Sequence, residues 1–127
     1  MKVGVCCHDA GAAEIISSYV MQKNIFPLYC LSGPAIKVFE RKIGTIDNIP
    51  LLDIVKNSDW LLCGTSWKSD LEWNVIKEAK KQQKKIIVFL DHWVNYRERF
   101  IRNNEECLPD EIWVGDHYAE KIAKDNF

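Results

Sequence analysis

Short, strongly apolar runs alternate with longer stretches of helical periodicity along this chain, and this alternation limits the fold more than any other feature of the sequence. A β-rich run followed by a helix, repeated several times, is typical of parallel strands joined by helices that cross over the sheet. The candidate strands are residues 2–7, 26–31, 60–63, 86–90 and 111–114, with a weaker one near Thr45.

Apolar side chains recur at helical spacing in the segments between these runs. The stripes are Ile15, Ile16, Tyr19 and Val20; Ile36, Phe39 and Ile43; Leu51, Leu52, Ile54 and Val55; Leu71, Val75, Ile76 and Ala79; and Tyr118, Ile122 and Ala123. Because crossovers between parallel strands are right-handed, the simplest strand order is 3-2-1-4-5-6. The sequence therefore predicts an α/β fold, a Rossmann-like three-layer sandwich with a mostly parallel sheet of five to six strands, formed by residues 1–127 as one domain.

Composition narrows the classes of partner. The chain has 127 residues, 47% hydrophobic and 28% charged, with a formal charge of -1, so charge gives no reason to expect nucleic acid. No apolar run approaches the roughly 20 residues of a membrane-spanning helix, and the first seven residues are too short for the apolar core of a signal peptide. The five cysteines lack CxxC spacing, which favours structural thiols in a reducing cytosol. We therefore expect a cytoplasmic protein without a transmembrane segment, which local patches could still hold at the inner face of the membrane.

The first loop with candidate chemistry follows residues 2–7. His8 and Asp9 form a titratable pair there, and Gly11 lies among alanines that let a ligand approach the start of the next helix. The loop lacks the GxGxxG pattern of dinucleotide binding and the Lys-Ser/Thr ending of a P-loop. Nicotinamide cofactors and P-loop nucleotide hydrolysis are therefore disfavoured. The structural alternative is that Asp9 caps the helix and His8 is only a polar strand end.

The second loop follows residues 60–63 and carries two hydroxyls and a large aromatic. Thr65 and Ser66 could hold a phosphate or a sugar, and Trp67 could stack on a sugar face. The alternative is a tight turn in which Ser66 or Ser69 caps the following helix and Trp67 packs on a neighbouring loop. Ser69 and Glu72 have the spacing of a capping box, which predicts a helix that starts at Asp70.

The third loop follows the apolar run at 86–90 and carries the most candidate functional side chains. Asp91 and His92 leave that run together, and a carboxylate beside an imidazole can position or exchange a proton. Trp93 comes next and is a candidate for substrate contact. The arginines of this loop are Arg97, Arg99 and Arg102. Guanidinium groups suit phosphate or carboxylate ligands, with Arg97 the first candidate, and the alternative is pairing with glutamates on an exposed helix.

Ligands of open α/β sheets bind outside the carboxyl ends of the strands, so we expect these loops to converge on one edge. Asp91 and His92 are our first choice for an acid-base pair there, and His8 and Asp9 the second. Asp116 and a neighbouring histidine repeat the pairing, but Asp116 is well placed to cap a helix over residues 116–125. No set of His, Cys, Asp or Glu has metal-ligand spacing, so we expect no metal site and no cofactor.

Four segments together resemble the N-terminal half of GT-B-type glycosyltransferases, in the branch found in bacterial surface-polysaccharide synthesis with related UDP-sugar epimerases and glycerophosphotransferases. The segments are His8-Asp9-Ala10-Gly11, Gly64-Thr65-Ser66-Trp67, Val88-Phe89-Leu90-Asp91-His92-Trp93 and Leu108-Pro109-Asp110-Glu111-Ile112-Trp113-Val114. The resemblance covers essentially the whole chain. It implies an acceptor-binding domain in which a carboxylate or histidine deprotonates an acceptor hydroxyl. The cleft residues that it implies are His8, Asp9, Thr65, Asp91 and His92.

The resemblance also implies partners. They are a nucleotide sugar and a glycan or lipid-linked acceptor, bound together with a second Rossmann-like domain. The chain is then the N-terminal half of a two-domain enzyme, or one subunit of a split enzyme in a homo- or hetero-oligomer, and alone it has only half of the site. Two alternatives stay open: a stand-alone nucleotide- or phosphate-binding module of flavodoxin-like shape without catalysis, and a non-catalytic interaction subunit.

Overall fold

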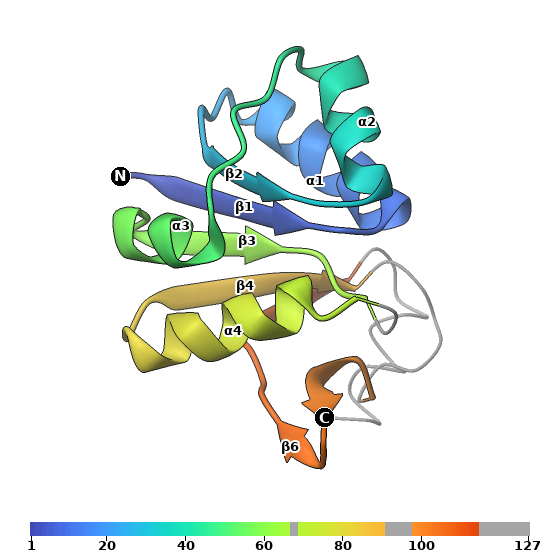
Figure 1. Ribbon diagram of the computed structural model, residues 1–127. Helices are drawn as coiled ribbons and strands as arrows, with labels where there is room; N and C mark the ends of the chain where they lie inside the picture. The colour runs from blue at the N-terminus through green and yellow to red at the C-terminus, as the bar shows by residue number, and fades with distance from the viewer. Residues whose placement is uncertain (67–68, 91–97, 115–127) are drawn as a thin grey trace.

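A five-stranded parallel sheet with helices on both faces forms the centre of the computed structural model (Figure 1), which describes residues 1–66, 69–90 and 98–114. The strands are β1 (Val3–Cys7), β2 (Leu28–Leu31), β3 (Trp60–Cys63), β4 (Lys85–Leu90) and β7 (Glu111–Val114). Their order is β2-β1-β3-β4-β7, and every neighbouring pair is parallel. The α/β class, the Rossmann-like sandwich and the relative order of these five strands are confirmed.

Alternating side chains of the strands divide the core into two layers, one on each face of the sheet. On β1, Val5 and Cys7 pack with α1 (Ala10–Gln22) and α2 (Pro34–Lys42), whereas Cys6 packs with α3 (Leu51–Asn57) and α4 (Leu71–Lys81). The period-2 geometry of a strand produces this division. The helical stripes predicted for residues 15–20, 51–55 and 71–79 lie within α1, α3 and α4, and the stripe predicted for 36–43 runs one residue past the end of α2 at Lys42.

In place of the weak strand predicted near Thr45, the structure has one isolated parallel bridge, between Asn48 and Tyr29 at the outer edge of β2. The Ile49 N–H is donated to the Tyr29 carbonyl there at 2.9 Å. The Asn48 side chain also accepts the Leu31 N–H at 2.7 Å. In a further strand, a backbone carbonyl would accept this N–H. The prediction of a strand here is wrong because the Asn48 side chain takes the Leu31 N–H that the next position of a ladder would need, and Pro50 has no N–H to donate.

The capping box predicted before α4 is also wrong. The helix begins at Leu71, one residue later than predicted, and Ser69 Oγ accepts the Leu71 N–H at 3.2 Å. The Ser69 N–H is donated to Ser66 Oγ at 3.1 Å, whereas a capping box would give it to Glu72. Glu72 instead turns into the protein, where its residue is 1% exposed.

A small hairpin separates β4 from β7 along the chain. It consists of a 3₁₀ turn, η1 (Glu98–Phe100), followed by β5 (Ile101–Arg102) and β6 (Glu105–Glu106). Asn103 and Asn104 join the two strands with φ angles of 51° and 65°, the backbone of a type I′ turn. The hypothesis that arginines of this segment lie on an exposed helix is therefore wrong for residues 98–106.

The five cysteines are free thiols, and four of them are buried. Cys6 lies in register with Cys30 and Cys63 on its two neighbouring strands, and burial raises the pKa of its thiol well above the usual range. Thiols that are kept neutral in this way act as small apolar side chains. Within the described residues no helix is long and apolar enough to cross a membrane.

Candidate functional site

The strand order creates a switch point between β1 and β3. The chain leaves β1 through α1 to reach β2 on one side, while β3 and β4 lie on the other side. Connections that diverge in this way open a crevice outside the carboxyl ends of the two strands. His8 and Asp9 come directly after β1, and Gly64, Thr65 and Ser66 directly after β3, so two of the three predicted loops meet at this edge.

The remaining predicted site residues lie outside the described residues. They are Trp67 of the second loop, and Asp91, His92, Trp93 and Arg97 of the third. The same holds for Asp116 and for the helix predicted over residues 116–125. Their roles stay predictions.

The backbone of His8 is held from two sides. Its N–H is donated to Glu72 Oε2 at 3.0 Å, and its carbonyl accepts the Ala35 N–H at 3.0 Å. The ring is fixed as well, because Nδ1 lies 2.9 Å from Ser32 Oγ. Beneath the ring lies Gly33, at φ 53°, where an added Cβ would stand 2.5 Å from Cε1 of His8. Any side chain at position 33 would therefore displace the imidazole.

The Asp9 side chain does not cap α1, which was the structural alternative for this residue. It occupies the N-cap position of α1 with extended backbone, but its carboxylate makes no capping hydrogen bond. Oδ1 of Asp9 instead lies 3.8 Å from His8 Nε2, and the two side chains are 28% and 27% exposed. A separation of this length exceeds a hydrogen bond. It leaves an imidazole nitrogen and a carboxylate side by side and accessible, able to share one small polar ligand atom.

Thr65 and Ser66 are brought to the same edge but are covered by the protein. The two residues are 2% and 3% exposed. Thr65 Oγ1 accepts a hydrogen bond from Arg99 Nη1 at 2.7 Å, and Ser66 Oγ accepts the Ser69 N–H. Both hydroxyls are therefore engaged in hydrogen bonds within the protein. Contact of Thr65, Ser66 or the half-buried Gly11 with a ligand stays a prediction.

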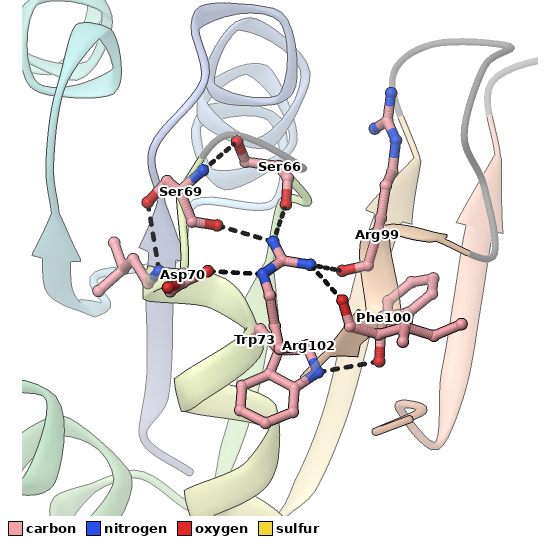
Figure 2. A network of polar contacts seen from close by, with 9 residues as sticks. Ser66, Ser69, Asp70, Trp73, Arg99, Phe100 and Arg102 are labelled. Atoms are coloured by element: carbon pink, nitrogen blue, oxygen red, sulfur yellow. Dashed lines mark hydrogen bonds and ion pairs between the residues drawn. The ribbon is translucent and has the colours of Figure 1, made fainter. Parts of the chain in front are cut away.

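Arg102 fastens the loop after β3 to the hairpin (Figure 2). Its guanidinium donates to the carbonyls of Ser66 and Ser69 at 2.7 and 3.0 Å, and to the Asp70 carboxylate at 2.5 Å. On the hairpin side it donates to the carbonyls of Arg99 and Ile101 at 3.3 and 2.8 Å. These bonds occupy the guanidinium within the protein, so the phosphate-binding hypothesis does not extend to Arg102.

Glu72 is the site residue that the sequence hypothesis misplaced. Its carboxylate holds the backbone of His8, and Oε2 also comes within 3.4 Å of where a Cβ on Gly64 would stand. A signal was present, because positions 72, 75, 76 and 79 share one helix face. The other three positions are apolar and buried, which marks Glu72 as a carboxylate directed into the core.

No group of three or more His, Cys, Asp or Glu in the described ranges is arranged to hold a metal ion. Comparisons with protein-family models, with curated proteins and with solved structures gave no match.

Proposed function

We propose that this chain is the acceptor-side domain of a sugar-nucleotide-dependent glycosyltransferase that acts in polysaccharide or cell-surface glycan synthesis. The observation that carries the proposal is the accessible 3.8 Å gap between His8 Nε2 and Asp9 Oδ1 at the switch point of the sheet. A second Rossmann-like domain would bind the nucleotide sugar opposite this edge. The enzyme would work in the cytoplasm or at the inner face of the membrane.

The gap suits a hydroxyl group. A hydroxyl oxygen placed between the two side chains accepts one hydrogen bond from Nε2–H and donates one to the Asp9 carboxylate. Ser32 supports this proton arrangement, because its O–H can be donated to Nδ1 while the ring proton stays on Nε2. During transfer the hydroxyl proton passes to Asp9, the oxygen bonds to the anomeric carbon, and the nucleoside diphosphate leaves with the electrons of the broken bond.

The charge of Asp9 favours this function over the phosphate-binding alternative. An ionised carboxylate within reach of the ligand attracts a hydroxyl donor and repels a phosphate. His8 and Asp9 also differ from a structural pair, since both side chains are more than a quarter exposed. We therefore rank hydroxyl binding above phosphate binding at this position.

Ligand titration followed by NMR of the histidine rings tests the proposal on the 127-residue chain. The probes are methyl glycosides of neutral hexoses and of N-acetylhexosamines, and separately UDP and GDP. We expect a glycoside to shift the His8 resonance saturably with a Kd in the millimolar range, about -4 kcal/mol, as suits one or two hydrogen bonds at an open edge. The His8 resonance is assigned by its loss in His8→Gln.

Asp9→Asn is the critical variant, because an amide keeps the size of the group but cannot take the proton. Bonds to charged groups contribute about 1.5–3 kcal/mol, so glycoside affinity should fall about tenfold or more. Asp53→Asn, an exposed carboxylate on α3, is the matched control and should bind as the native chain does. Absence of saturable shifts with every glycoside would overturn the proposal. A response to UDP or GDP alone would replace it with the nucleotide-binding module.

A further inference from the structure

Ser32 approaches the ring nitrogen of His8 that Asp9 does not face. It is the first residue after β2, is partly exposed, and its N–H is donated to the Cys7 carbonyl at 3.1 Å. Its Oγ stands 2.9 Å from His8 Nδ1. The serine hydroxyl and the imidazole are thus held together by two adjacent strand ends whose backbones are tied to each other.

The order of groups is hydroxyl, imidazole, carboxylate. The carboxylate of Asp9 favours a proton on the nitrogen nearest to it, Nε2. Nδ1 then carries the lone pair, and the O–H of Ser32 is directed to it. An activated nucleophile typically has a base within hydrogen-bond reach and a third group that orients the base. The distances between these groups are often longer before substrate binds. Compared with serine hydrolases, the two ring nitrogens have exchanged places.

We propose that Ser32 is a nucleophile that accepts an acyl group from an ester or thioester, with His8 as its base. This reaction goes beyond the proposed glycosyl transfer, because it uses the Nδ1 side of the ring and a group of the protein itself. An uncharged carbonyl is the electrophile that fits, since the Asp9 carboxylate disfavours phosphorylated donors. Oγ bonds to the carbonyl carbon, its proton passes to Nδ1, and the alcohol or thiol leaves with that proton. Water then releases the carboxylic acid and restores the serine.

The fixed ring supports this assignment. Glu72 and Ala35 hold the backbone of His8, and Gly33 leaves the space that the imidazole fills. A nucleophile and base that are already oriented need less reordering to reach the transition state. Ser18 on α1 offers a comparison: it is exposed, its Oγ donates to the Glu14 carbonyl at 3.0 Å, and it accepts from Lys42 Nζ at 2.6 Å, so its described partners are a carbonyl and an ammonium group instead of an imidazole.

Labelling with an alkyl fluorophosphonate tests the proposal on the 127-residue chain. In this reaction Oγ bonds to phosphorus, fluoride leaves and the proton passes to His8. Peptide mapping by mass spectrometry should find the label on Ser32, at a rate at least about tenfold above that of Ser18. Ser32→Ala should lose this label, whereas Ser18→Ala should be labelled as fast as the native chain.

His8→Gln should slow labelling of Ser32 at least about tenfold, and Asp9→Asn should slow it several-fold while altering only a partly exposed carboxylate. Circular dichroism checks that each variant is folded. An unlabelled Ser32, or a rate on Ser32 that neither variant changes, would overturn the assignment. The phosphonate needs no sugar ligand, so this outcome is independent of the glycoside titration.

Discussion

Replacement of Arg102 by alanine would remove the connection between the loop after β3 and the hairpin before β7. The Arg102 side chain is 16% exposed, so water would not fully replace the bonds that it loses. Four main-chain carbonyls accept from it: Ser66, Ser69, Arg99 and Ile101. The substitution would remove the hydrogen-bond donor of all four carbonyls.

The expected loss of unfolding free energy follows from the hydrogen-bond partners of Arg102. Net contributions of hydrogen bonds to stability are about 1 kcal/mol each, so loss of the carbonyl bonds should cost about 3–4 kcal/mol. The ion pair with Asp70 adds little, because the Asp70 side chain is 69% exposed and such pairs contribute about 1 kcal/mol at most. The expected loss is a large part of the roughly 5–15 kcal/mol of net stability of a typical domain.

Urea unfolding, followed by far-ultraviolet circular dichroism, measures this loss as a shift of the midpoint at constant slope. Arg102→Lys should lose most of the same stability, since one ammonium group cannot reproduce a planar fork that serves carbonyls on two segments. Asp70→Asn is the matched control and should change stability by about 1 kcal/mol or less. If Arg102→Ala were no more destabilising than Asp70→Asn, the assigned connection would be incorrect.

Two other perturbations test single contacts. Gly33→Ala should destabilise the fold by roughly 1–3 kcal/mol and shift the His8 ring resonances, because its Cβ meets Cε1 of His8 at a positive φ. Gly44→Ala, at φ 116° with open space around it, should leave His8 unmoved, and equal ring shifts in both variants would refute the contact. The hydrogen bond from Arg41 lowers the pKa of Glu14. The ionised Glu14 carboxylate therefore stabilises the fold at pH values above its pKa in the unfolded chain, and this stabilisation is lost as the pH falls through its pKa in the folded protein. Arg41→Ala should return that pKa toward its ordinary value in a carboxyl-carbon NMR titration, and an unchanged value would contradict the assigned cause.

Part of the candidate site follows from the sequence. The position of His8 and Asp9 at a strand end, and of Thr65 and Ser66 at another, could be inferred from where apolar runs stop. Their environments could not. Asp9 occupies a capping position without capping, and the hydroxyls of Thr65 and Ser66 are buried beneath protein donors.

The sequence by itself determined the alternation of strands and helices, the relative order of five strands and the polar character of their carboxyl ends. These features depend on periodicity within single elements and on the right-handedness of the crossover that joins one strand to the next. Only the tertiary structure decided which partners meet, such as His8 with Ser32, and His8 with Glu72, 64 positions away along the chain. The periodicity on α4 could indicate that Glu72 is buried, but the donor that its carboxylate binds is fixed by how the helix packs across the sheet.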